Sequence, residues 1–204
     1  MLSQIRPAIV LLVLFTALTG LAYPLAITGV AQIVMPYRAN GSLLPIGGPP
    51  VGSALIGQNF TADKYFHSRP SATQTQDPAH PDDSSKTIDA PYNAANSTGS
   101  NLGPTSQKLL DRVKADVEAK HAAGLTGAIP ADAVTTSASG LDPHISPENA
   151  LAQVTAVAKA RNLPEDKVRA LVEANIEGRF VGLIGEPRVN VLRLNMALDA
   201  LTTS

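Results

Sequence analysis

The chain contains no cysteine among its 204 residues, and this absence removes several classes of function at once. Disulfide staples, thiolate metal sites and a cysteine nucleophile are all excluded. The compartment stays open, because a domain outside the cytoplasm can do without disulfides when its core is adequate, and an intracellular domain needs none.

An excess of charge of either sign is also missing. All 17 acidic residues and 15 of the 16 basic residues follow residue 37, so this part carries a formal charge of 15 − 17 = −2. Binding to nucleic acid requires a clustered excess of lysine and arginine. The composition therefore predicts no nucleic-acid partner and favours a protein or a lipid bilayer.

Catalytic motifs are absent as well. The sequence has no Asp-Lys-Thr-Gly motif of a P-type pump, no Walker A spacing and no Gly-x-Ser-x-Gly. Its four histidines lack the spacing of zinc ligands; they are His67, His80, His121 and His144. We therefore predict no catalytic residue, no metal site, no cofactor of its own and no independent enzyme activity. His144 is expected to hydrogen-bond within a loop that precedes a helix cap at Ser146.

Charged side chains are missing from Pro7 to Tyr37, where Leu, Ile, Val and Ala dominate. At about 1.5 Å per residue, roughly 20 such residues cross the hydrocarbon core of a bilayer. We predict a short tail at 1–6, a transmembrane helix at 7–35 and a soluble domain at 36–204. The helix is expected to kink or tilt after Pro24 and to end where Met35 meets a proline.

A cleaved signal peptide is the alternative interpretation, because Arg6 gives a positive start and Gly29-Val30-Ala31 a small-x-small cleavage pattern. Signal sequences carry apolar runs of about 7–15 residues. The longer run here favours a retained anchor. Basic residues near the span are almost balanced, with Arg38 alone soon after it, so charge only slightly favours a domain outside the cytoplasm.

The rest of the chain reads as an α+β domain. Short strands and loops are predicted from residue 38 to 103, followed by three or four helices. Segment 70–100 has few apolar side chains and is either a mobile insertion or a surface laid against something else. Helices are predicted at 104–121, from a Ser146 cap to about 161, from Pro164 to a stop at Gly178, and within 189–201. The predicted inner faces contain Leu109, Val113 and Val117, then Leu151, Val154 and Ala158, then Val168, Leu171 and Val172.

One segment offers a mechanism for binding a small anion. Gly and Ser residues directly before a helix let backbone N–H groups point at a phosphate. The candidate residues are Ser97, Gly99, Ser100, Asn101 and Gly103. An ordinary turn with a helix cap would use the same residues. Arg69, Arg179 and Arg188 likewise suit either a clamp on an anion or an anchor within the domain.

Taken in order, six segments resemble the C subunit of the bacterial Kdp-type potassium-transporting ATPases. They are 18–24 (LTGLAYP), 55–60 (LIGQNF), 65–72 (YFHSRPSA), 99–104 (GSNLGP), 140–147 (GLDPHISP) and 185–192 (GEPRVNVL). The resemblance covers nearly the whole chain.

This resemblance implies a single-pass, non-catalytic subunit of the inner membrane that is needed for assembly and activity. Its partners would be a potassium-conducting subunit, an ATP-hydrolysing subunit and the lipid bilayer. The predicted residues for packing in the membrane are Ala17, Gly20, Ala22, Tyr23, Pro24 and Gly29.

The resemblance also implies a catalytic chaperone that raises the ATP affinity of the hydrolysing subunit and shares its ATP. That role is linked to a Ser-Gly-Gly-Ser segment, whereas this chain reads Ser97-Thr98-Gly99-Ser100. A side chain at Thr98 would disfavour a backbone angle that only glycine adopts. The implied location of the domain, on the outer side of the membrane where ATP is scarce, conflicts with the same role. The alternative is a purely structural subunit that caps the potassium-conducting subunit without contacting nucleotide.

Overall fold

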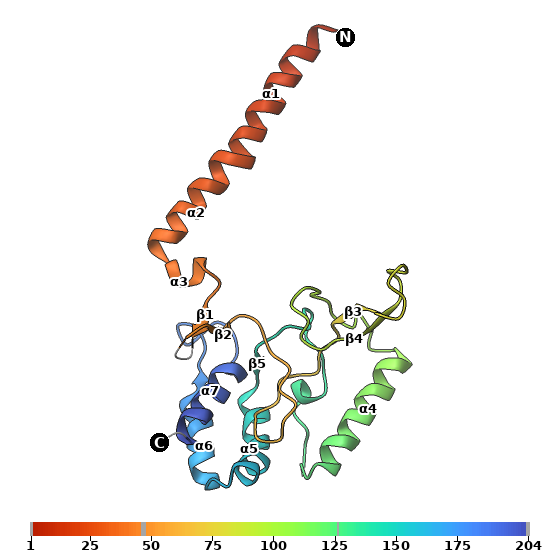
Figure 1. Cartoon of the computed structure of the whole chain (residues 1–204), viewed down its shortest axis with the longest axis vertical. Coiled ribbons are helices and arrows are strands. Elements are labelled where there is room, and N and C mark those ends of the chain that lie inside the picture. Colours follow the sequence, from red (N-terminus) through yellow and green to blue (C-terminus); the bar gives the residue numbers. More distant parts are fainter. Residues whose placement is uncertain (1, 46–47, 126, 203–204) are drawn as a thin grey trace. The chain divides into compact units, whose positions relative to one another are not determined.

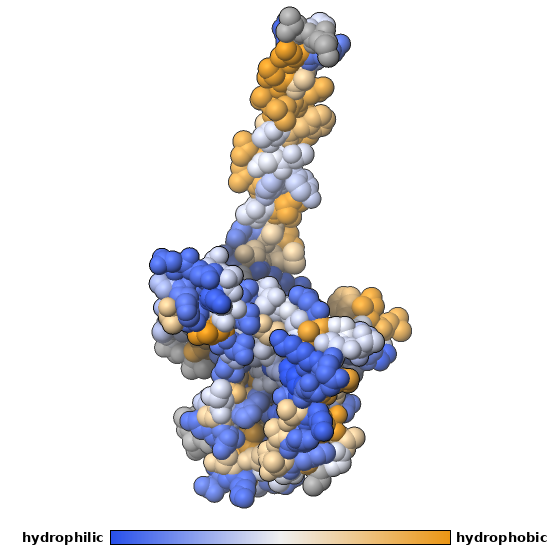
Figure 2. Space-filling model, turned by 90° about the vertical axis from the view of Figure 1, so that its right-hand side faces the viewer, coloured by the Kyte–Doolittle hydropathy of each residue, from blue (hydrophilic) through white to orange (hydrophobic). Residues whose placement is uncertain are grey.

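The uncharged N-terminal run folds as one helical rod in the structure, a computed structural model that describes residues 2–45, 48–125 and 127–202. Helical backbone is continuous from Ile5 to Val34, 30 residues long, with none of its most apolar window buried. At about 1.5 Å per residue this rod exceeds the roughly 30 Å of a hydrocarbon core. Much of its surface is hydrophobic, with less hydrophobic residues in its middle part (Figure 2). Its parts are η1 (Leu2–Gln4), α1 (Ile5–Ala17), η2 (Leu18–Ala22) and α2 (Tyr23–Val34). Met1, in the predicted tail, lies outside the described residues.

A wide turn interrupts this rod just before Pro24. The segment η2 is a π-helix in which the N–H of Tyr23 donates to the carbonyl of Leu18, five residues earlier. Pro24 has no N–H and its ring crowds the carbonyl four residues before it, so the regular ladder cannot continue through it. The kink or tilt was predicted after Pro24, but the irregular segment lies before it, as the π turn at Leu18–Ala22, and Tyr23–Val34 is a regular α-helix. The helix ends at Met35, whose φ of −139° leaves the helical region ahead of Pro36.

Residues 1–53 form one unit and residues 54–204 another. After the rod, the first unit contains a short helix and an antiparallel hairpin in which Leu43 pairs with Ser53. The hydroxyl of Ser53 donates to the carbonyl of Gly41 at 2.7 Å. These elements are α3 (Pro36–Ala39), β1 (Leu43–Pro45) and β2 (Pro50–Ser53).

The second unit is an α+β domain built around a small antiparallel sheet with strand order β5-β7-β6. Helix α5 packs on α6 and α6 on α7, and the elements are visible in Figure 1. They are β3 (Gln74–Gln76), β4 (Thr87–Asp89), α4 (Gln107–Ala122), η3 (Ala131–Ala133), β5 (His144–Ile145), α5 (Pro147–Arg161), α6 (Glu165–Ala174), β6 (Ile176–Glu177), β7 (Arg188–Asn190) and α7 (Val191–Thr202). The predicted fold class, a single membrane-length helix followed by an α+β domain, is confirmed.

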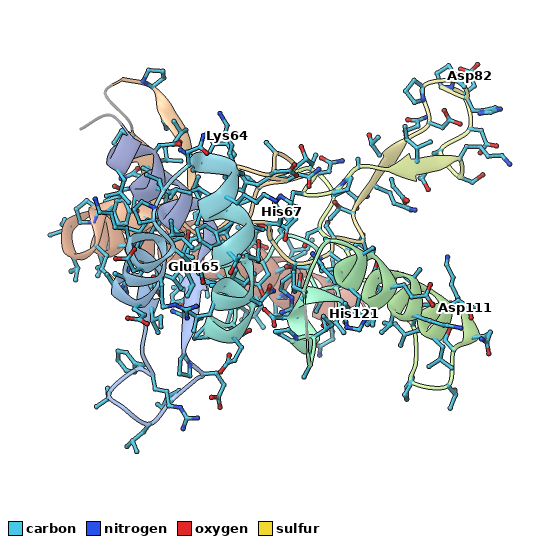
Figure 3. The ribbon with its side chains drawn as sticks, turned by 90° about the horizontal axis from the view of Figure 1, so that it is seen from below. Lys64, His67, Asp82, Asp111, His121 and Glu165 are labelled. Carbon is cyan, nitrogen blue, oxygen red and sulfur yellow. The ribbon has the colours of Figure 1, made fainter. Side chains whose placement is uncertain are left out.

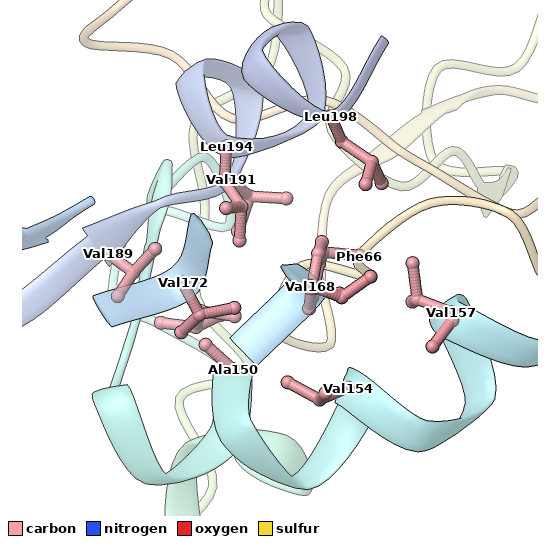
Figure 4. Close-up of a cluster of buried hydrophobic side chains, with 12 residues drawn as sticks. Phe66, Ala150, Val154, Val157, Val168, Val172, Val189, Val191, Leu194 and Leu198 are labelled. Atoms are coloured by element: carbon pink, nitrogen blue, oxygen red, sulfur yellow. The ribbon is translucent and has the colours of Figure 1, made fainter. Parts of the chain in front are cut away.

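The hydrophobic core of this domain lies between α5, α6, α7 and β7, with Phe66 inserted from a loop (Figure 4). Its buried members are Phe66, Ile145, Ala150, Val154, Val157, Ala158, Val168, Val172, Val189, Val191, Leu194 and Leu198. The sequence predicted inner faces for α5 and α6 correctly, except that Leu151 and Leu171 are only partly buried. These two leucines lie at the margin of the same cluster.

Several predicted helix ends differ from the observed ones. Helix α4 begins at Gln107 rather than residue 104, because the hydroxyl of Ser106 caps the N–H of Leu109. Helix α6 ends at Ala174 and not at Gly178, because the following residues pair as strand β6 with β7. Helix α5 begins at its Ser146 cap and ends at Arg161 as predicted.

Helix α4 has no fully buried side chain, in contrast to α5. The apolar stripe predicted for it, Leu109, Val113 and Val117, is only half-buried. Segment 70–100 contains the β3–β4 hairpin, in which Gln74 pairs with Asp89. Polar contacts hold the base of this hairpin: the amides of Asn93 and Asn96 both donate to the carbonyl of Gln74.

Candidate functional site

Arg69 lies where several of the family-like segments meet. Its guanidinium donates to the carboxylate of Asp142 at 3.1 Å and to the carbonyl of Thr136 at 3.3 Å. Of the two interpretations of this arginine, the anchor within its own domain is therefore confirmed. Arg179 and Arg188 also form internal ion pairs, with Glu186 at 2.6 Å and Glu177 at 3.1 Å.

A second junction forms around Ser71. Its hydroxyl donates to the carbonyl of Gly140 at 2.7 Å and accepts the N–H of Tyr92 at 3.1 Å. The phenol of Tyr92 donates to the carbonyl of Arg69 at 2.9 Å. Burial raises the pKa of Tyr92 to about 12, so its hydroxyl stays protonated and donates at physiological pH.

Close approach of backbones explains two glycines at this junction. Gly140 has a φ of +66°, and a Cβ there would lie 2.7 Å from the carbonyl oxygen of Thr98. A Cβ at Gly57 would lie 2.7 Å from the carbonyl oxygen of Asp142, and the N–H of Gly57 donates to Leu141. The family-like segments at 55–60, 65–72 and 140–147 are thus in direct contact, and their side chains join parts of the domain.

Asp142 has the lowered pKa expected of a structural carboxylate. Burial alone would raise its pKa, but hydrogen bonds from the side chain and backbone of His144, with the charge of Arg69, outweigh burial and lower it. The predicted local hydrogen bond of His144 is confirmed, although this residue lies in strand β5. Ser146, two residues on, caps α5 at Asn149 and donates to the carboxylate of Asp132 at 2.8 Å.

The candidate anion loop, residues 97–104, runs beside residues 136–140. The N–H of Thr98 donates to the carbonyl of Ser139 at 3.0 Å, and the hydroxyl of Ser97 donates to the same oxygen at 3.2 Å. A Cβ at Gly99 would lie 2.9 Å from the carbonyl oxygen of Ala138. This part of the loop therefore already uses its polar groups and its lack of side chain to pack against a neighbouring segment.

The backbone angles of this loop show whether Thr98 needs a conformation that only glycine adopts, and they show where the loop turns. Within it, the described residue with a positive φ is Asn101, at 51°. Thr98 adopts an ordinary angle, so its side chain causes no strain there. Ser100 accepts a hydrogen bond from Thr136 at 3.4 Å, and the carbonyl of Gly103 accepts the N–H of Ser106. The end of the loop is thus a turn followed by the helix cap, and the N-terminus of α4 lies several residues beyond Gly99.

An open groove of about 910 Å³ lies between this loop, helix α4 and the segment around Arg69. Gly99 and Ser100 lie on its wall. Figure 3 shows α4 and the neighbouring segments from below, with His121 and Asp111 labelled on the helix. Among its lining residues are Arg69, Lys108, Arg112 and Lys120, with Asp89 and Asp116 as the acidic ones. Arg69 pairs with Asp142 at 3.1 Å and Arg112 with Asp116 at 3.2 Å, whereas Lys108 and Lys120 form no ion pair with the residues that the structure describes.

The residues predicted to pack in the membrane lie along the rod and are all exposed. A Cβ at Gly20 or Gly29 would meet nothing within 4 Å. These residues are Ala17 in α1, Gly20 and Ala22 in η2, and Tyr23, Pro24 and Gly29 in α2. Among the described residues, no group of three or more His, Asp or Glu side chains could hold a metal ion.

Comparison with known proteins supports the family-like segments. The family model described as KdpC: K+-transporting ATPase, c chain, matches residues 5–200, a range that includes the apolar rod. The chain belongs to the KdpC family. It is similar to the potassium-transporting ATPase KdpC subunit of Bradyrhizobium diazoefficiens, with 63% identity over 199 residues that cover 98% of each chain. The subunits of the same name from Rhodopseudomonas palustris and Methylobacterium nodulans are 61% and 62% identical, over 99% and 98% of each chain. Membership in the KdpC family confirms the resemblance and identifies an accessory subunit of a potassium-transporting ATPase, not its catalytic subunit.

Sequence reasoning missed Asn195, which the structure places in the core. Its side chain accepts the N–H of Phe66 at 2.9 Å and donates to the carbonyl of the same residue at 3.0 Å. One signal could have revealed it: Asn195 is a polar residue on the apolar face of a helix, four residues after Val191 and one after Leu194. Ser71 and Tyr92 were also missed, because their partners are backbone groups far away in the sequence.

Proposed function

We propose that this chain anchors itself through a single helix at 7–35 in the bacterial inner membrane and helps to assemble a potassium-transporting ATPase. The observation that carries this proposal is the apolar rod from Ile5 to Val34, which is exposed along its length and exceeds the thickness of a bilayer. A chain with such a rod and no catalytic motif is suited to hold other subunits together. The potassium-conducting subunit and the ATP-hydrolysing subunit are the partners we infer.

Small residues on the rod support helix packing in the membrane. Ala17, Gly20 and Gly29 leave room for a neighbouring backbone, and close approach of this kind stabilises helix pairs in lipid. The π turn before Pro24 interrupts the regular hydrogen-bond ladder of the rod in the same region. We infer that this part of the rod, including Ala22 and Tyr23, contacts the potassium-conducting subunit.

Co-purification tests the anchoring role. A chain in which a cleavable export signal peptide replaces residues 1–37 should fail to purify with the other subunits, whereas the full chain should purify with them. A matched variant, Gly20→Leu, keeps the rod apolar but fills the space beside it and should weaken association. Undiminished association of the truncated chain would contradict the role of the rod.

The side of the membrane is part of this proposal. We infer that residues 36–204 lie on the outer, periplasmic side, the location that the family resemblance implies. The basic residues near the span, Arg6 before it and Arg38 after it, are nearly balanced and do not oppose this location. Protease added to intact spheroplasts should digest this domain. Protection in spheroplasts and digestion only after lysis would place the domain in the cytoplasm.

A second candidate function is the catalytic chaperone, which would raise the ATP affinity of the hydrolysing subunit. Its support is the groove of about 910 Å³, whose lining includes Gly99 and Ser100 together with Lys108 and Lys120. Cationic side chains beside a glycine-containing loop suit a phosphate group. The N–H of Thr98 argues against this function, because it already donates a hydrogen bond to the carbonyl of Ser139 and is not free to bind a phosphate.

Thermal stability distinguishes this second candidate, because a ligand that binds the native state must stabilise it. If the groove binds nucleotide, millimolar ATP should raise the melting temperature of the full chain, and Lys108→Ala with Lys120→Ala should abolish the rise. Lys167→Ala, on α6 and outside the groove lining, is the control and should keep it. No rise in the unmodified chain would leave the purely structural subunit as the better account.

A further inference from the structure

An exposed apolar loop joins β6 to β7. Within this loop, defined as residues 179–186, Phe180, Val181, Leu183 and Ile184 are 72%, 74%, 81% and 68% exposed. Figure 3 shows the segment projecting from the domain at the lower left, with its side chains pointing outward. Single exposed apolar residues are ordinary, but four neighbouring ones form a contiguous patch of the kind that marks an interaction site.

The loop has a defined backbone structure although its apolar side chains bury little surface. The N–H of Phe180 donates to the carbonyl of Ile184 at 2.8 Å, and the N–H of Ile184 donates back at 3.0 Å. Val181 has a φ of 52°, an uncommon angle for a β-branched residue, and Gly182 follows at 74°. A strained, hydrogen-bonded turn that presents large apolar side chains is already ordered before it binds, and such order lowers the entropic cost of association.

Charge around the loop favours a protein over an anionic lipid surface as its partner. Arg179 pairs with Glu186 at 2.6 Å, so the two ends of the loop neutralise each other. Below them Glu177 pairs with Arg188 at 3.1 Å and with Arg193 at 3.2 Å. Segments that bind anionic lipid surround their apolar residues with an excess of Lys and Arg. In residues 179–186 the single basic residue is Arg179, and its charge is paired with that of Glu186.

Because the apolar rod tethers the domain to a membrane, it limits the proteins that this loop can contact. A domain tethered to one membrane encounters its co-assembled subunits at a high effective concentration, so a small patch can suffice for a stable contact. We propose that residues 180–184 insert as an apolar knob into an apolar pocket on the extramembrane surface of another subunit of the same ATPase. This inference rests on the proposed assembly function and adds to it the surface of the soluble domain that makes the contact.

Site-specific photocrosslinking in the assembled complex tests the knob. A benzophenone amino acid placed at Leu183 in the full chain, co-expressed with the other subunits, should crosslink to one of them under ultraviolet light. The same group at Leu110, which is 54% exposed on α4, is the control and should give at least tenfold less of that product. Because both side chains are exposed, neither replacement should lower the melting temperature by more than about 2 °C.

A second pair of variants measures how much the loop contributes to assembly of the complex. Phe180→Ser combined with Leu183→Ser should reduce the yield of co-purified partner subunits at least tenfold, and Leu110→Ser should leave it unchanged. A complex that forms normally without a protein crosslink at Leu183 would overturn the knob, as would crosslinking to lipid alone or to a second copy of this chain. Failure of the unmodified chain to co-purify with any subunit would instead refute the assembly function, and the inference with it.

Discussion

Replacing Asn195 with alanine should destabilise the soluble domain more than any exposed asparagine replacement. The side chain of Asn195 is 2% exposed and satisfies both backbone groups of Phe66, which is itself fully buried. Without it, one N–H and one carbonyl lose their partners in a place that water does not reach. A buried polar group left unpaired costs about 1–3 kcal/mol, so the two groups together should cost about 2–6 kcal/mol.

This loss is large enough to measure by thermal unfolding. A domain of this size shifts its melting temperature by roughly 2–4 °C per kcal/mol, so the expected decrease is on the order of 10 °C. The melt is followed by circular dichroism on the full chain in detergent, with Asn59→Ala, at an exposed position, as the matched control. Melting temperatures of Asn195→Ala and Asn59→Ala within about 1 °C of each other would refute the idea that this side chain holds Phe66 in the core.

Two further predictions concern the junction between the family-like segments. Asp142→Asn should cost about 1–2 kcal/mol at neutral pH, because it removes the ion pair with Arg69 at a partly exposed site. The native pKa of Asp142 lies below its usual value of 3.8, so its contribution to stability is present above that pH and is lost as the pH falls through the native pKa. The difference in unfolding free energy between the unmodified chain and Asp142→Asn should therefore shrink in acid. A difference that stays constant down to about pH 3 would contradict this prediction. Gly140→Ala should cost about 2–4 kcal/mol in chemical denaturation, because its Cβ would meet the carbonyl of Thr98 at 2.7 Å. Gly124→Ala, with a φ of 93° and nothing within 4 Å, isolates the backbone cost, and equal losses at the two glycines would show that the clash is unimportant.

Local signals in the sequence predicted most of the fold. The absence of charge from Pro7 to Tyr37 predicted the rod, and the Ser146-Pro147 pair predicted the start of α5, because both features act within a few residues. The end of α6 was missed for a non-local reason. Strand β6 pairs with β7, and the residues near Gly178 carry only a weak local signal for a strand partner that lies further along the chain.

The candidate site was harder to predict than the fold. Ser97, Gly99 and Ser100 have the composition of an anion loop, yet Ser97 and the N–H of Thr98 bond to the carbonyl of Ser139, 42 and 41 residues away. No local pattern distinguishes a glycine that accommodates a neighbouring backbone from one that accommodates a phosphate. Arg69 shows the same difficulty, since its partner Asp142 lies 73 residues away.

The mass and membrane attachment of the mature chain test the central claim most directly. A C-terminally tagged chain is extracted from bacterial membranes with alkaline carbonate and then weighed intact by mass spectrometry. The account predicts that the chain stays in the membrane pellet and still contains residues 7–35. A chain released by carbonate, or shortened by cleavage near Ala31, would contradict a retained single-helix anchor.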